Sequence, residues 1–80
     1  MKSIEEARAT AIKYLKDESL TVVSSGHTEE LYVFVFDVPG AETPTPGAPV
    51  VTVDKNTGEA EELILPSKEG FEILNSTQFN

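Results

Sequence analysis

The sequence predicts an α+β fold in which an N-terminal helix packs on one face of a four-stranded antiparallel sheet, giving two layers. Three observations indicate this fold. Residues 4–16 have the apolar spacing of a helix, several short segments rich in β-branched residues follow, and a tight-turn sequence lies at residues 55–58. The 80 residues suit one domain, 1–80, because they contain neither a repeat nor an interior linker.

The helix expected over residues 4–16 begins with a capping-box pattern, because Ser3 precedes Glu6 by three positions. Its apolar stripe consists of Ile4, Ala7, Ala11 and Leu15. The two small alanines would let a sheet approach closely, so we interpret this face as core-facing.

Four segments favour strands, because they are rich in β-branched or aromatic residues and are bounded by turn-forming residues. Residues 25–30 would connect the first two strands, and Asn56 and Gly58 would supply left-handed positions in a hairpin between the last two. The predicted strands are Leu20–Ser24, Leu31–Val38, Val50–Asp54 and Glu59–Leu65.

Prolines determine what we expect for residues 39–49 and for the end of the last strand. Residues 39–49 hold four prolines and predict a stiff surface loop; a ligand for an aromatic groove is the alternative. Pro66 would end the last strand, and Ser67 would cap a short C-terminal helical turn through Glu69–Leu74. Residues 76–80 are expected to fray.

The strand at residues 31–38 is apolar on both faces, yet a single helix can cover only one face of the sheet. We expect the helix to cover the bulkier aromatic set, which consists of Tyr32, Phe34 and Phe36. The aliphatic set would then lie on the second face; it consists of Leu31, Val33 and Val35. Three kinds of cover stay open: the C-terminal segment with Phe71, Ile73 and Leu74, a second copy of the chain, or a partner protein.

The charge is −8 overall and unevenly distributed. Residues 1–16 carry four basic and two acidic side chains, whereas residues 17–80 carry two basic and twelve acidic ones. This balance argues against nucleic-acid binding, which needs a basic surface. The negative charge either keeps the protein soluble or steers a basic protein partner toward it. The chain itself is expected to be a monomer or a homodimer. The predicted partner-binding residues are Glu29, Glu30, Asp37 and Glu42, expected around loops at one end of the sheet, with Leu31, Val33 and Val35.

No catalytic, metal or cofactor site is predicted, and we expect a protein that is not an enzyme. The chain lacks cysteine and has one histidine, His27, placed in a predicted turn beside Glu29. Residues 54–59 are similar to a calcium loop, but Gly58 and Leu65 occupy the fifth and twelfth ligand positions. The longest apolar run has six residues and the N-terminus lacks a signal-peptide pattern, so we expect a cytoplasmic protein.

Several short motifs are shared with a bacterial family. They are Ala7, Ala11, Tyr14 and Leu15 in the helix, Tyr32, Phe34 and Phe36 in the central strand, Gly47-Ala48-Pro49, the hairpin 51–59, Pro66 and Phe71–Leu74. Over residues 4–75 the chain resembles the YrhB domain, also called the immunity protein 35 family. The resemblance implies that the chain is an immunity protein whose partner is a bacterial polymorphic toxin, which it neutralises, and it implies no catalytic residues.

A second resemblance covers only the hairpin. Asp54 followed by Thr57-Gly58-Glu59 is similar to a motif of PepSY domains. That resemblance implies a protease-inhibitory or regulatory domain. An interaction domain of another kind is the third interpretation.

Overall fold

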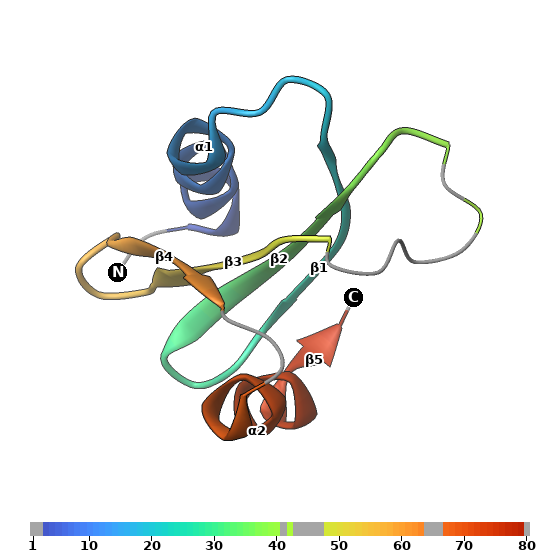
Figure 1. Ribbon diagram of the computed structural model, residues 1–80. Helices are drawn as coiled ribbons and strands as arrows, with labels where there is room; N and C mark the ends of the chain where they lie inside the picture. Colours follow the sequence, from blue (N-terminus) through green and yellow to red (C-terminus); the bar gives the residue numbers. More distant parts are fainter. Residues whose placement is uncertain (1–2, 41, 43–47, 64–66, 80) are drawn as a thin grey trace.

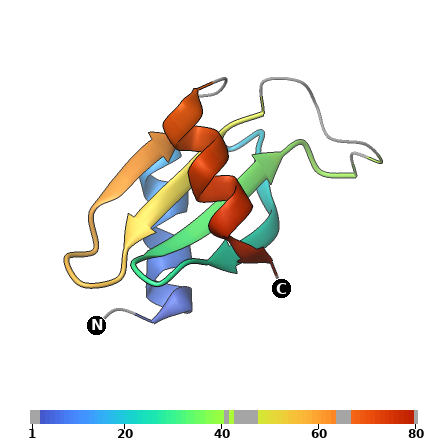
Figure 2. The ribbon, with the colours of Figure 1, turned by 90° about the horizontal axis from the view of Figure 1, so that it is seen from below.

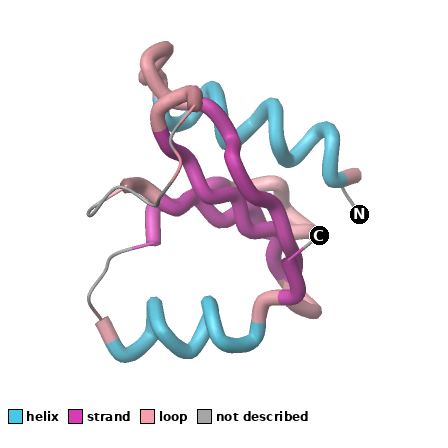
Figure 3. The backbone as a smooth tube through the Cα atoms, turned by 90° about the vertical axis from the view of Figure 1, so that its right-hand side faces the viewer, coloured by secondary structure: helices cyan, strands magenta, loops and turns pink. Residues whose placement is uncertain are grey.

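The computed structural model describes residues 3–40, 42, 48–63 and 67–79. Two helices lie on opposite faces of one antiparallel sheet (Figures 1 and 3). The α+β class is therefore confirmed, with five strands in the order β4-β3-β2-β1-β5 instead of four. The elements are α1 (Ile4–Leu15), β1 (Thr21–His27), β2 (Leu31–Asp37), β3 (Val50–Asp54), β4 (Ala60–Leu63), α2 (Lys68–Ser76) and β5 (Gln78–Phe79).

Helix α1 has the predicted N-cap. The Ser3 hydroxyl accepts a hydrogen bond from the Glu6 amide at 3.2 Å, which satisfies one of the free N–H groups of the first turn. The helix ends at Leu15, one residue before the predicted end, and its C-cap Lys16 has a left-handed φ of 54°. Ala7 and Ala11 are fully buried, so α1 lies close to β2, β3 and β4.

The first face of the sheet holds the main core. Phe34 and Phe36 are 0% and 1% exposed and lie under α1, as the alternation in β2 predicts. Val51 and Val53 of β3 join them on this face, and Tyr32 packs at the margin of the cluster.

The C-terminal segment lies over the second face, as one of the three alternatives predicts, but Phe71 is 52% exposed and does not contribute to the cover. Figure 2, seen from the α2 side, shows the helix running across the strands. Ser67 caps it by accepting the Gly70 amide at 3.0 Å, and Gly70 is buried. Val33 beneath is 0% exposed. The predicted turn at residues 69–74 is in fact a nine-residue helix.

Two sequence-based predictions, one for residues 25–27 and one for the C-terminal residues, are wrong. Residues 25–27 were expected in a connection but belong to β1, and residues 78–79, expected to fray, form β5. The two segments pair with each other, Gly26 opposite Phe79 and His27 opposite Gln78. Gly26 permits this approach because a Cβ there would lie 2.6 Å from the Gln78 carbonyl oxygen.

The other boundaries that can be compared shift by one or two residues. Strand β2 ends at Asp37, one residue before the predicted end, and β4, described over Ala60–Leu63, begins one residue after the predicted start. Residues 64–66, where Pro66 was expected to end the strand, lie outside the described residues, as do residues 41 and 43–47 of the proline-rich loop. Across the described part of the chain, no helix has the length and apolar character needed to cross a membrane.

Candidate functional site

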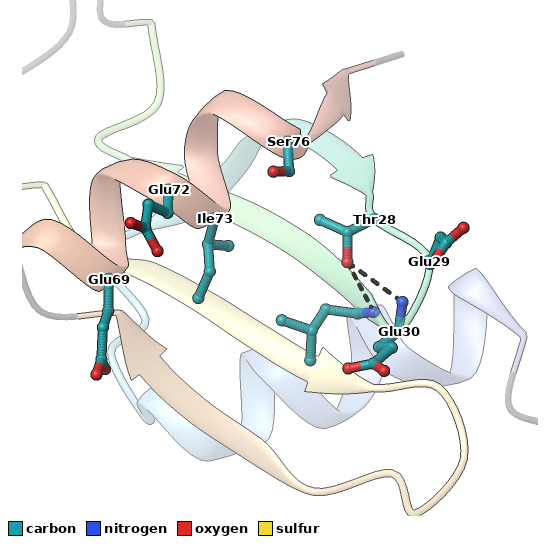
Figure 4. A pocket seen from close by; sticks show the side chains of 8 residues that line it. Thr28, Glu29, Glu30, Glu69, Glu72, Ile73 and Ser76 are labelled. Atoms are coloured by element: carbon teal, nitrogen blue, oxygen red, sulfur yellow. Dashed lines mark hydrogen bonds between the residues drawn. The ribbon is translucent and has the colours of Figure 1, made fainter.

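A groove separates α2 from the outer face of the sheet. Its main part has a volume of about 620 Å³, is largely open to solvent, and lies between α2 and the turn joining β1 to β2 (Figure 4). A second part of about 340 Å³ continues along β3 and β4 and shares Leu31, Glu69 and Ile73 with the first. We call the two parts together the α2 groove. The main part is lined by Thr28, Glu29, Glu30, Leu31, Glu69, Glu72, Ile73 and Ser76.

The β1–β2 turn forms one wall, and hydrogen bonds hold it in place. The Thr28 hydroxyl accepts the amides of Glu30 at 3.3 Å and Leu31 at 3.1 Å (Figure 4). Lys55, from the β3–β4 turn, donates its amide to the Glu30 carbonyl at 2.9 Å. Its ammonium group donates to the Thr28 carbonyl at 2.6 Å and lies 5.2 Å from the centre of the Tyr32 ring. The backbone that carries Glu29 and Glu30 is thus fixed to a neighbouring turn.

Helix α2 forms the opposite wall. Its lining residues recur at the spacing i, i+3, i+4 and i+7, which places them on one face of a helix. Ile73 points from α2 toward the sheet (Figure 4). The half-buried Leu31 of β2 lines the same groove, and we call these two side chains its floor. The four residues of this stripe are Glu69, Glu72, Ile73 and Ser76.

The groove is apolar at its floor and acidic at its edges. Glu30, Glu69 and Glu72 border the main part, Glu61 and Glu62 border the second part, and Glu29 points outward from the turn (Figure 4). Within the described residues, the structure gives these carboxylates no ion pair. Lys55, the nearest cation of the turn, already binds a backbone carbonyl and an aromatic ring.

Three of the seven predicted partner-binding residues line the groove: Glu29, Glu30 and Leu31. Val33 and Val35 lie on the same face, but Val33 is fully buried and Val35 is half-buried. These two valines therefore expose little side-chain surface to which a partner could bind.

The four predicted carboxylates do not gather at one end of the sheet. Asp37 closes β2 at the end opposite Leu31, about 20 Å away along an extended strand. It is 4% exposed, and its carboxylate accepts the Val38 amide at 2.7 Å. Glu42 is exposed beyond that same end. The expected cluster is wrong because a seven-residue strand separates its two pairs.

Sequence reasoning missed the α2 wall. Glu69, Glu72, Ile73 and Ser76 were not selected as site residues, because Gly70 weakens the helix pattern around them. Their spacing was the available signal. A strand that is apolar on both faces needs a second covering element. The helical spacing of Glu69, Glu72 and Ile73 indicates that this element is a helix with carboxylates beside its apolar residue.

Two carboxylates outside the main groove have lowered pKa values. Backbone N–H groups of Thr57 and Asn56, which donate to Asp54 at 2.9 and 2.7 Å, lower the pKa of its carboxyl group. Hydrogen bonds from the hydroxyl and amide of Ser19 lower the pKa of Asp17. Both are turn-stabilising interactions, and they leave the two carboxylates ionised at neutral pH.

The described residues contain no cluster of side chains that could hold a metal ion. Among them, no three His, Asp or Glu side chains come together as metal ligands. His27 lies in β1 instead of the predicted turn and is half-buried beside the groove, near Thr28, Lys55 and Gln78.

Comparison with protein-family models, curated proteins and solved structures gives no significant match for this chain. The resemblances to the YrhB and PepSY domains therefore stay predictions from sequence. The α2 groove stands as the candidate site on its geometry alone.

Proposed function

We propose that this chain is a small acidic protein-binding domain that neutralises a bacterial toxin in the cytoplasm, as an immunity protein does. The observation that carries the protein-binding part is the α2 groove, where carboxylates from two separate segments surround an apolar floor. The toxin as the partner rests on the resemblance to the YrhB domain.

The charge pattern supports a basic partner. Residues 17–80 carry twelve acidic and two basic side chains, and the groove is formed within this part of the chain. Exposed charges of one sign mainly raise the rate of association with an oppositely charged protein, and salt screens the effect. An immunity protein must bind its toxin before the toxin acts, so a fast association rate suits this function.

Co-expression of the chain with the product of a neighbouring toxin gene tests the function. The gene encoding the chain should protect cells against a toxin encoded beside it, and the tagged chain should recover that toxin in a pull-down. The association rate of the purified pair should fall by about tenfold or more between low and physiological salt. A chain that neither protects cells nor retains the neighbouring toxin is not its immunity protein.

A PepSY-like inhibitory domain is the second candidate, favoured by the hairpin from Asp54 to Glu59. Its Asp54 carboxylate accepts the Asn56 and Thr57 amides, and Gly58 takes the left-handed φ of 77° that closes the turn. A neighbouring peptidase gene, together with inhibition of that peptidase by the purified chain, favours this candidate over a toxin-neutralising one.

A further inference from the structure

We propose that the α2 groove binds a cationic segment of a partner protein, with one apolar side chain on the Leu31–Ile73 floor and Lys or Arg side chains on both sides of it. This inference rests on the proposed protein-binding function and names the chemistry of the partner. It follows from the shape of the groove, from its charge, and from the way α2 is attached.

The size of the groove suits side chains of a peptide. Its two parts have volumes of about 620 and 340 Å³ and are open to solvent, so they can receive side chains of an extended segment without enclosing it. Leu31 and Ile73 are only half-buried, so the floor still exposes apolar surface to solvent. An apolar side chain seated there would remove that surface from water, and this is the main source of affinity at a small site.

The charge of the groove selects a cationic occupant. Glu30 comes from the turn, Glu72 from α2 and Glu61 from β4, so carboxylates border the floor on more than one side. Within the described residues, none of these carboxylates forms an ion pair. A segment with basic side chains on both sides of its apolar residue matches this arrangement, whereas phosphate-rich nucleic acid is repelled.

The attachment of α2 allows the groove to adjust to such a segment. The backbone of α2 comes close to the strands at few points, unlike that of α1. At its C-terminal end the helix continues into the two-residue strand β5, which pairs with β1, whereas the Ser67 cap stabilises only the first turn of the helix itself. A small shift of α2 can therefore widen the groove without disturbing the core under α1.

Peptide titration followed by NMR tests the proposal. The probes are capped peptides: Arg-Arg-Leu-Arg-Arg, the same peptide with Ser in place of Leu, and Glu-Glu-Leu-Glu-Glu. The first should bind and shift amide signals in residues 28–31 and α2. The Ser peptide should bind about tenfold more weakly, because it lacks the apolar side chain, and the acidic peptide should not bind.

Paired variants separate the groove from overall charge. Glu30→Gln with Glu72→Gln removes two groove carboxylates and should weaken binding of the first peptide about fivefold. Glu5→Gln with Glu18→Gln removes two exposed charges elsewhere and should change it less than twofold. Equal weakening by both pairs, or equal affinity of the Leu and Ser peptides, would overturn the proposal. Thermal unfolding of each variant confirms that it is folded.

The proposed function and this inference can fail separately. If the chain protects cells but Glu30→Gln with Glu72→Gln leaves the affinity for the toxin unchanged, the groove proposal is wrong and the function stands. If the Leu peptide binds the groove as expected but no partner is neutralised, the groove proposal stands and the toxin-neutralising function is wrong.

Discussion

The two faces of the sheet are built from the same strands, but they are covered in different ways. Under α1, Phe34 and Phe36 are enclosed by the helix and by the valines of β3. Under α2, Val33 is enclosed, but Leu31 at the end of the same strand stays half-buried and borders a groove. One face is closed along its length, and the other is closed only at its centre.

The covering helices explain the difference. Helix α1 faces the sheet with Ala7 and Ala11, whose small side chains let the backbone approach. Helix α2 buries only Gly70 fully and presents Glu69, Glu72 and Ile73 along the groove. Close packing stabilises the fold, and incomplete packing leaves surface for binding. We infer that stability resides mainly on the α1 face and recognition on the α2 face.

The largest expected effect is the loss of a ring under α1. Phe34→Ala should lower the free energy of unfolding by about 3–5 kcal/mol, because it leaves a cavity in a closed core. Ile73→Ala on the other face should cost about 1 kcal/mol, because a half-buried side chain leaves no closed cavity. Urea denaturation measures both. Equal losses would contradict the contrast between the faces.

A substitution in β1 should loosen the α2 face alone. The Cβ of Gly26→Val would lie 2.6 Å from the Gln78 carbonyl oxygen and 2.7 Å from Cγ2 of Thr77, so β5 must move away. We expect a loss of about 1–3 kcal/mol. NMR should show the disruption in β5 and α2 while signals of α1 persist. Thr21→Val, exposed in the same strand, is the control; disruption that spread first to α1 would argue against two separable faces.

The smallest expected effect is on the pH dependence of stability, and it involves Asp54 in the β3–β4 turn instead of either covered face. The pKa of Asp54 is lowered in the folded protein by the Thr57 and Asn56 amides, so its ionised form stabilises the fold. That contribution is present above the unfolded pKa of about 3.9 and is lost as the pH falls through the folded value. Asp54→Asn should flatten the fall in Tm below about pH 4, measured by thermal unfolding from pH 6 to 2. An unchanged pH profile would assign the fall to other groups, such as Asp17, whose pKa is also lowered.

The sequence predicts those parts of the molecule whose signals are local. The cap at Ser3, the stripe of α1, the β3–β4 hairpin and the two-faced pattern of β2 each lie within a short window, and the structure confirms them. Of the two left-handed positions expected in the hairpin, Gly58 has a positive φ and Asn56 does not. The aromatic set under α1 also follows from local alternation and ring size.

The parts that were missed depend on contacts between distant residues. Gly26 has the composition of a turn, and only the approach of Gln78 and Phe79 explains why it is in a strand. The groove needs α2 placed across β2, which the weak helix pattern around Gly70 does not fix. The wall at the β1–β2 turn could therefore be predicted from the acidic residues near Leu31, whereas the wall formed by α2 could not.

Native-state hydrogen exchange tests the central contrast most directly. The account predicts that amides of β2 and β3, such as those of Phe34 and Val51, exchange only through global unfolding. Amides within α2, such as those of Ile73 and Leu74, should exchange through local opening at a lower free energy, because the backbone of α2 comes close to the strands at few points. Equal protection of α2 and β2 would contradict the account, since the second face would then be as firmly closed as the first.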